Sequence, residues 1–306
     1  MKQKFILGTR GSNLALTQTR DVKARLENAF PELDVEINVI KTEGDKDLKS
    51  SLASMGGRGV FVQSIEKALF EKKVDAAVHS LKDLPSGLPG GLMLGASPER
   101  VDPRDAFISR DGVSLASLPK GSVIGTGSER RRIQLAKICP CVTFKNIRGN
   151  IETRLDKLSK DEYDAIILAG AALTRLDMKF IVTEFLDVET VVPAPCQGAI
   201  GIECRSDDER TIGILNKIDD PEVRMCVDAE RTFINILGMG CHTPVGAYAA
   251  SVAGGISFTA FVGSDDWGII QKTVKTSKGK LTDTVKKLAS DFRLRINKNN
   301  ENLENK

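Results

Sequence analysis

Short apolar runs alternate with amphipathic stretches over the first two-thirds of the chain. The apolar, β-prone runs predict strands at residues 5–7, 35–40, 74–78, 123–124, 142–147 and 165–168. Apolar positions at helical spacing predict helices at residues 14–29, 65–70, 130–138 and 151–158. This alternation favours parallel sheets that are covered by helices.

The alternation falls into two similar series. Residues 7–12 and 124–128 each place a Gly-Thr turn directly after a predicted strand. Residues 74–78 and 163–167 share an Asp-Ala pair within an apolar run. We therefore expect an α/β fold with two similar doubly wound domains, in which helices cover both faces of each sheet.

The pattern changes after Pro221. A helix at 222–237, strands at 245–251, 256–263 and 269–276, and a last helix at 281–296 predict a small α+β C-terminal domain. Residues 297–306 are rich in Asn and predict a disordered tail.

Composition and charge narrow the possible functions. The 44 Lys and Arg residues nearly balance the 41 Asp and Glu residues, giving a net charge of +3, and aromatic residues make up 5% of the chain. A nucleic-acid binder usually has a strongly basic face or aromatic stacking residues, so this class is disfavoured. There is no apolar run typical of a signal peptide or a membrane helix, and we expect a cytoplasmic protein with no membrane partner. Six Cys residues without a C-x-x-C pair, and two His residues, predict no metal site.

The loop after the first predicted strand contains Arg10 and Ser12. Backbone amides at a helix start, together with an arginine fork, favour an anion. The alternative is an ordinary turn in which Ser12 only caps the following helix.

Arginines gather after two strands of the second series. Arg130, Arg131 and Arg132 fall in the first turn of a predicted helix, where positive charge opposes the helix dipole. Arg148 and Arg154 follow the next strand around another glycine turn. Such guanidinium forks match carboxylates or phosphates, so we expect a bound anion to compensate their charge. The alternative is a solvated basic face.

A third loop, at residues 78–85, contains Lys82 and Asp83. A carboxylate beside a lysine at the end of a strand is placed for acid–base work or for stabilising a cation. The alternative is a plain surface loop. We expect His79, at the end of the strand itself, to be a packed histidine.

Two further segments are candidates for function. Residues 42–60 are polar and contain four glycines, which is typical of a mobile lid or of a loop without a role. Cys241 lies in a glycine-containing loop of the C-terminal domain. An accessible thiol there is either a nucleophile or attachment point, or an inert side chain.

Taken in order, several of these segments resemble a known family, porphobilinogen deaminase, also called hydroxymethylbilane synthase. The segments that carry the resemblance lie at residues 56–62, 77–85, 102–107, 148–155, 163–169, 197–203 and 240–241. The resemblance implies two domains similar to type II periplasmic binding proteins around a cleft, plus the small C-terminal domain. It places domain 1 at 1–98 and 197–217, domain 2 at 103–193 and domain 3 at 221–296.

The resemblance also implies a dipyrromethane cofactor, attached through a thioether to Cys241, and a catalytic Asp83. The residues that it implies for cofactor binding are Lys82, Asp83, Thr126, Ser128, Arg130, Arg131, Arg148 and Arg154. The residues that it implies for substrate binding are Arg10, Ser12, Arg148, Arg154 and Arg175. Departures from the family pattern include Glu129 in the arginine loop, Cys196 in place of a glycine, and Met239 near Cys241.

The implied reaction condenses four porphobilinogen units head to tail on the attached dipyrromethane, with release of ammonia. Hydrolysis then releases hydroxymethylbilane for tetrapyrrole biosynthesis. Porphobilinogen and the growing oligopyrrole are polycarboxylates, which suits arginines at glycine turns. Loss of ammonia leaves a cation that a carboxylate such as Asp83 stabilises. The family further implies a monomer. The alternative function is a non-catalytic protein that binds small carboxylates.

Overall fold

The computed structural model describes residues 3–41, 62–238 and 243–304. The chain forms two compact units, each considered by itself: unit 1 is Met1–Val101 with Gly198–Met225, and unit 2 is Asp102–Gln197 with Cys226–Lys306. Unit 1 is therefore discontinuous. The finer division into three domains stays a prediction.

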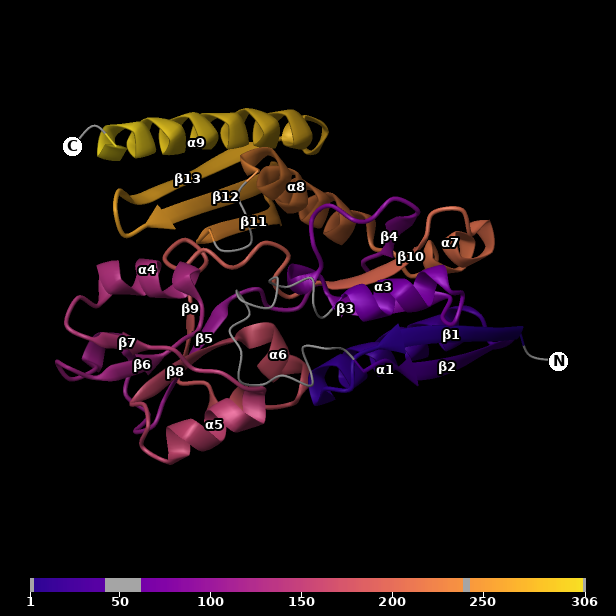
Figure 1. Cartoon of the computed structure of the whole chain (residues 1–306), viewed down its shortest axis with the longest axis horizontal. Helices are drawn as coiled ribbons and strands as arrows, with labels where there is room; N and C mark the ends of the chain where they lie inside the picture. Colours follow the sequence, from indigo (N-terminus) through magenta and orange to yellow (C-terminus); the bar gives the residue numbers. More distant parts are fainter. Residues whose placement is uncertain (1–2, 42–61, 239–242, 305–306) are drawn as a thin grey trace. The chain divides into compact units, whose positions relative to one another are not determined.

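The elements of unit 1 follow the expected alternation of strands and helices (Figure 1). They are β1 (Gln3–Thr9), α1 (Asn13–Ala29), β2 (Leu33–Val39), α3 (Gln63–Phe70), β3 (Ala76–Ser80), the 3-10 turn η2 (Leu81–Asp83), β4 (Leu92–Ala96), β10 (Ile200–Arg205) and α7 (Glu209–Leu215). Their sheet has the order β2-β1-β3-β10-β4. β1 is parallel to β2 and β3, and β10 is antiparallel to β3 and β4.

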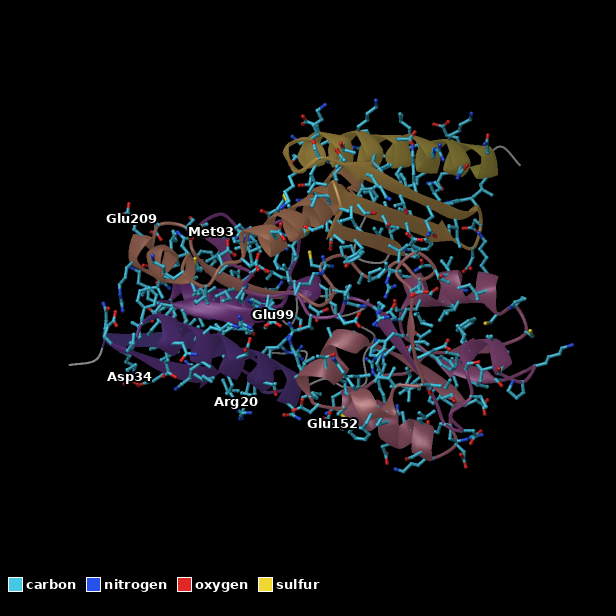
Figure 2. All side chains as sticks on the ribbon, turned by 180° about the vertical axis from the view of Figure 1, so that it is seen from behind. Arg20, Asp34, Met93, Glu99, Glu152 and Glu209 are labelled. Atoms are coloured by element: carbon cyan, nitrogen blue, oxygen red, sulfur yellow. The ribbon has the colours of Figure 1, made fainter. Side chains whose placement is uncertain are left out.

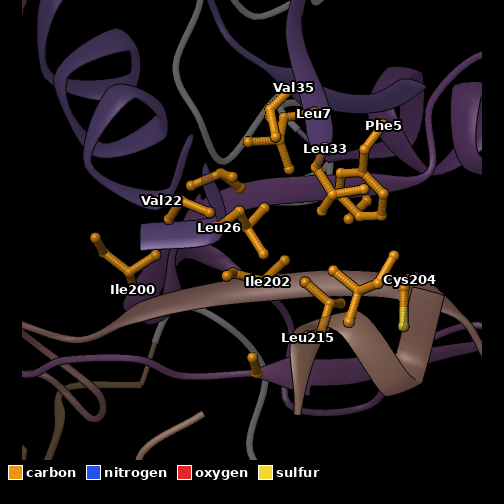
Figure 3. Close-up of a cluster of buried hydrophobic side chains, with 14 residues drawn as sticks. Phe5, Leu7, Val22, Leu26, Leu33, Val35, Ile200, Ile202, Cys204 and Leu215 are labelled. Carbon is orange, nitrogen blue, oxygen red and sulfur yellow. The ribbon is translucent and has the colours of Figure 1, made fainter. Parts of the chain in front are cut away.

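Helices cover both faces of this sheet because its central strands are apolar on both sides. Phe5 and Leu7 of β1 pack with Leu26 of α1 and Leu215 of α7 in one buried cluster, which Figure 3 shows. Ile6, on the opposite face of β1, packs against the cluster that includes Leu69 of α3. Side chains alternate between the two faces along a strand, so each face of the sheet has its own core.

Unit 2 begins with a second sheet of the same design. Its elements are β5 (Asp105–Ser109), β6 (Val123–Gly125), α4 (Glu129–Ile138), β7 (Thr143–Lys145), α5 (Ile151–Ser159), β8 (Ala165–Ala169), α6 (Gly170–Arg175) and β9 (Glu184–Leu186). The sheet order is β7-β6-β8-β5-β9, with β6 parallel to β7 and β8 and β5 antiparallel to β8 and β9. Phe107 packs on the α4 side, and Ala106 packs with Leu158 of α5 on the other side. The two sheets match strand for strand, which confirms the expected pair of similar doubly wound α/β domains.

The rest of unit 2 is a three-stranded antiparallel sheet with two helices, which confirms the predicted α+β segment. Its elements are α8 (Pro221–Leu237, in unit 2 from Cys226 onward), β11 (Val245–Val252), β12 (Gly255–Ser264), β13 (Gly268–Thr276) and α9 (Leu281–Glu304). Phe233 of α8 packs against Phe258 of β12 and Phe292 of α9, with ring centroids 5.7 and 5.4 Å apart. Phe261, also on β12, joins a buried cluster with Ile133 of α4 and Val192. This second contact explains why the C-terminal segment and the second sheet form one compact unit.

The tail differs from the expectation. Residues 297–304 continue α9 to Glu304 instead of being disordered. Extending a helix that is already anchored through Phe292 and Ile296, both buried, costs less than starting one, so the Asn-rich segment adds its last turns.

The outer faces of the helices are polar. Arg20 of α1 and Glu209 of α7 are exposed (Figure 2). Among the described residues, no helix is long and apolar enough to cross a membrane.

Candidate functional site

In unit 1, the predicted polar residues lie at the carboxyl edge of the sheet. Arg10 and Ser12 follow β1, and Lys82 and Asp83 follow its parallel neighbour β3. The carboxyl ends of parallel strands share one edge, so the structure brings the two loops to the same edge. The Ser12 hydroxyl accepts a hydrogen bond from the Ala15 amide at 3.3 Å. The expected capping role of Ser12 is therefore confirmed, and its role toward a substrate stays a prediction.

The turn that carries Lys82 and Asp83 is anchored on both sides. Leu81 and Leu84 are buried, with 1% and 5% exposure. The Leu81 amide donates to the Ala199 carbonyl at 3.0 Å, and the Leu84 amide donates to the Leu81 carbonyl at 3.2 Å. Lys82 and Asp83, between these anchors, are half-buried. The turn thus fixes the backbone of a lysine and a carboxylate that keep partial contact with solvent.

In unit 2, three loops reach the carboxyl edge of the parallel strands β7, β6 and β8. The loop after β6 contains Thr126 and Ser128. Thr126 is buried, and its hydroxyl accepts from the Ser128 amide at 3.2 Å. Ser128 is the N-cap of α4 and accepts from the Arg131 amide at 3.5 Å. Both hydroxyls therefore shape the turn that presents the arginines.

Arg130 and Arg131 are buried beneath this edge, which corrects the alternative of a solvated basic face. Their exposures are 5% and 7%. The Nη2 atoms of Arg130 and Arg131 donate to the two carboxylate oxygens of Asp105, at 2.8 and 2.7 Å. Their Nη1 atoms donate to the carbonyls of Val192 and Ile167, at 2.6 and 2.9 Å. The expected compensating anion is thus, in part, a carboxylate of the protein itself.

Asp105 is the negatively charged residue between Arg130 and Arg131. Burial by itself would raise its pKa, but the positive charges of Arg130 and Arg131 and the hydrogen bonds from Arg131 and Gln197 outweigh burial and hold the pKa well below its usual value. Asp105 is therefore ionised and pairs with both guanidinium groups. The Nε atom of Arg131 is buried and has no hydrogen-bond partner among the described residues.

The remaining predicted arginines are less enclosed. Arg148 follows β7, Arg154 lies on α5, and Arg175 ends α6, and all three are half-buried. The Arg154 Nε donates to the Gly149 carbonyl at 2.9 Å. Arg132 points to other partners, because it pairs with Glu129 at 2.6 Å and with Asp265. The structure thus divides the predicted residues into a unit 1 set and a unit 2 set, each at the carboxyl edge of its own sheet.

Some predictions lie outside the described residues. These are the attachment residue Cys241, the nearby Met239, and the lid at 42–60.

Sequence reasoning missed Asp105 and Gln197 as members of the site. Gln197 Nε2 donates to Asp105 Oδ1 at 2.8 Å and to the Pro103 carbonyl at 2.7 Å. One signal was available: Asp105 begins a run, Ala106 to Ile108, that is otherwise apolar and fully buried. A charged residue at the start of a buried strand needs a charged partner, and the arginine-rich helix start is the natural source.

Comparison with known proteins places this chain in a family. A family model described as "Porphobilinogen deaminase, dipyromethane cofactor binding domain" matches residues 5–213, and one described as "Porphobilinogen deaminase, C-terminal domain" matches residues 224–293. A porphobilinogen deaminase of Brevibacillus brevis is 46% identical over 279 residues, covering 91% of this chain and 90% of the relative. One from Staphylococcus carnosus is 49% identical over 266 residues, covering 86% of each. The chain belongs to the porphobilinogen deaminase family.

Membership defines the enzyme class. As a porphobilinogen deaminase, the chain is a transferase of tetrapyrrole synthesis with a dipyrromethane cofactor, and the non-catalytic alternative is not favoured. Among solved structures, the effector-binding domain of BenM with benzoate aligns at 14% identity and a TM-score of 0.43, covering 71% of this chain and 91% of that chain.

The residues of unit 2 fit such a cofactor. A dipyrromethane built from porphobilinogen carries several carboxylates, and the start of α4 holds a buried N–H donor, Arg131 Nε, that has no hydrogen-bond partner among the described residues. An unsatisfied buried donor costs about 1–3 kcal/mol, which a ligand carboxylate would remove.

Proposed function

We propose that Asp83 is the catalytic carboxylate of this deaminase and that the arginines of unit 2 hold the carboxylates of its cofactor and substrate. The proposal rests on the polar residues that the structure holds at the carboxyl edge of each of the two mixed sheets. One edge has an anchored turn with Lys82 and Asp83, and the other has Arg130 and Arg131 fixed by the buried Asp105. In this proposal the chain is a hydroxymethylbilane synthase that adds four porphobilinogen units and releases the product by hydrolysis.

The cofactor is held in two ways. Cys241 forms the thioether, and Lys82, Asp83, Thr126, Ser128, Arg130, Arg131, Arg148 and Arg154 bind the pyrroles and their carboxylates. When bound, the dipyrromethane supplies the first acceptor carbon and keeps the growing chain attached to the protein. Arg10, Ser12, Arg148, Arg154 and Arg175 bind the incoming substrate.

Asp83 acts on the reacting substrate. The C–N bond of the protonated aminomethyl group of porphobilinogen breaks, and ammonia leaves with the bonding electron pair, so the pyrrole becomes a cation. A carboxylate held near that cation lowers the energy of the transition state. The fixed backbone of η2 keeps Asp83 in place, so little reorganisation is needed during the reaction. Lys82, its neighbour, supplies a positive charge for the carboxylates of the cofactor and substrate.

Location and assembly complete the proposal. We propose a cytoplasmic monomer, in line with the family. Sedimentation of the purified protein at micromolar concentration tests the monomer, and a mass of twice 33.2 kDa would contradict it.

The test of Asp83 is the variant Asp83→Asn, which keeps the size of the side chain and removes its charge. We expect the fold to be retained, because Asp83 is half-buried, and the single-turnover rate with porphobilinogen to fall by at least 100-fold, in the range of losses for a single electrostatic group. Asp111→Asn is the matched control, since Asp111 is exposed and belongs to neither set. A near-normal rate for Asp83→Asn would reject the assigned role.

A further inference from the structure

A buried pair of titratable side chains lies next to the turn that carries Asp83. His79, on β3, and Glu203, on β10, face the same side of the sheet, because Ala77 is opposite Glu203 and His79 is opposite Gly201. The His79 Nε2 lies 3.1 Å from Glu203 Oε2. His79 is 7% exposed and Glu203 is fully buried. This confirms the expected packed histidine and adds an acidic partner that the sequence did not reveal.

A third titratable group lies near the pair. Burial raises the pKa of Glu66 on α3, the charge of Glu203 raises this pKa further, and His79 acts in the opposite direction. The face of the sheet that carries the pair is therefore the face that α3 covers, in agreement with the cluster of Ile65 and Leu69 around Ala77.

A contribution to the stability of unit 1 does not explain why a glutamate is buried at position 203. Arg205, two residues further along the same face of β10, donates to the Leu69 and Val74 carbonyls at 2.8 Å each and so joins α3 to the sheet. Glu203 makes no comparable set of bonds, because its Oε1 is buried without a hydrogen-bond partner among the described residues. Well-packed apolar residues are usually at least as stabilising as a buried ion pair. The pair therefore needs another explanation.

The position of the pair supplies one. His79 is followed by Ser80 and then by η2, whose first residue, Leu81, bonds to Ala199 just before β10. Gly201, opposite His79, leaves room for Leu81: a Cβ at Gly201 would lie 2.6 Å from Leu81 Cδ1. The His79–Glu203 contact is a diagonal side-chain link between β3 and β10, from the position opposite Gly201 to the position opposite Ala77. It restrains the last residues of β3 relative to β10, and these residues set where the turn begins.

We propose that His79 and Glu203 are positioning residues that hold the Lys82–Asp83 turn in its working position. This inference rests on the proposed role of Asp83. Neither side chain needs to touch the substrate, because the pair acts through the backbone of β3 and η2. Removing the pair loosens the turn, so Asp83 spends less time where it stabilises the substrate cation, and turnover falls more than substrate binding does.

The main test compares Glu203→Gln with Cys204→Ala in the holoenzyme. The first change is isosteric and replaces the carboxyl group of Glu203 by an amide. Cys204 is the next residue of β10, is equally buried, and faces the opposite core, so its truncation disturbs the sheet without touching the pair. We expect Glu203→Gln to lower kcat about tenfold with KM within twofold of the wild type, and Cys204→Ala to keep kcat within twofold. A normal kcat for Glu203→Gln would overturn the proposal.

Two further measurements separate positioning from general damage. In an Asp83→Asn background, Glu203→Gln should reduce the residual single-turnover rate no further, because its effect is transmitted through Asp83. If Glu203→Gln lowered the single-turnover rate by the same factor with Asp83 present and with Asp83→Asn, the proposal would be overturned. His79→Gln keeps an amide donor for Glu203 and should retain more turnover than His79→Leu, and equal losses in the two would also overturn it. The His79 pair of variants carries the test if Glu203→Gln does not fold.

The same set of variants separates the two proposals. If Asp83→Asn turns over normally, the assigned role of Asp83 is wrong, and the positioning proposal falls with it. If Asp83→Asn is impaired while Glu203→Gln is normal, only the positioning proposal is wrong.

Discussion

Replacing Asp105 by Asn tests the electrostatic core of unit 2. The Asp105 carboxylate accepts from Arg130 Nη2 at 2.8 Å, Arg131 Nη2 at 2.7 Å and Gln197 Nε2 at 2.8 Å, and it is fully buried. Asn keeps the volume but removes the charge and turns one acceptor into a donor that faces guanidinium groups. Breaking a buried pair by removing one partner costs about 3–5 kcal/mol, because the remaining charge is left uncompensated. We therefore expect Asp105→Asn to lose about 3–5 kcal/mol of unfolding free energy at pH 7.

The pH dependence of this loss has a definite sign. The pKa of Asp105 in the folded protein lies below that of an Asp in the unfolded chain. The carboxylate therefore contributes its full stabilisation above the unfolded-state pKa of about 3.9, and the contribution is lost as the pH falls toward the lower folded-state pKa. The stability gap between the wild type and Asp105→Asn should be constant from pH 8 to 5 and should narrow below about pH 4.

Urea unfolding followed by circular dichroism at pH 7, 5 and 3 measures both effects. Asp111→Asn is the control for the loss of one carboxylate, since Asp111 is 68% exposed and pairs with Arg110 at 3.3 Å. An exposed pair of this kind contributes less than about 1 kcal/mol. If Asp105→Asn lost less than about 1 kcal/mol of unfolding free energy, in the range of an exposed pair, the reasoning would be refuted. It would also be refuted if the stability difference between the wild type and Asp105→Asn did not narrow in acid.

Three other predictions concern single positions. Cys196 has a φ of 61°, a backbone conformation that is strained for any residue with a side chain. In urea unfolding, Cys196→Gly should therefore be about 1 kcal/mol more stable than Cys196→Ala. The reverse order would show that the backbone is not strained there. The pKa of Glu66 is raised from 4.5, so its ionisation opposes folding. Glu66→Gln should therefore have a higher melting temperature than the wild type at pH 8 and the same melting temperature in acid. A difference in melting temperature that grows in acid would contradict this. Arg154→Ala should lower kcat/KM for porphobilinogen by about 10- to 100-fold, which is the equivalent of one charge-assisted hydrogen bond. Its melting temperature should stay unchanged. An unchanged kcat/KM would show that Arg154 does not belong to the site.

The sequence was most informative where the structure is local. Parallel strands with neighbouring helices, such as β1 with α1, leave apolar periodicity within one stretch of chain, and they were found. β4, β5, β9 and β10 were not identified. Each is antiparallel to neighbours that lie far away in sequence, as in the pairing of β10 with β3, so the pairing leaves no local pattern. β3 itself was placed two residues early, because the apolar run begins before the ladder does.

The site shows the same division. Ser12 was placed correctly as a helix cap, because a cap depends on residues within one turn. The partner of Arg130 and Arg131 could not be read from the sequence, since Asp105 lies on another strand 25 and 26 residues away. The same holds for His79 and Glu203, which are 124 residues apart. Long-range charge pairs depend on the topology of the sheet, which apolar spacing does not encode.

The intact mass of the protein, purified from cells that make porphobilinogen, tests the central claim most directly. The account predicts a mass that exceeds the polypeptide by two linked pyrrole units, a surplus that maps to the peptide containing Cys241 and is absent from Cys241→Ser, which also makes no hydroxymethylbilane. A wild-type protein of bare polypeptide mass that nevertheless forms tetrapyrrole at full rate would contradict the account.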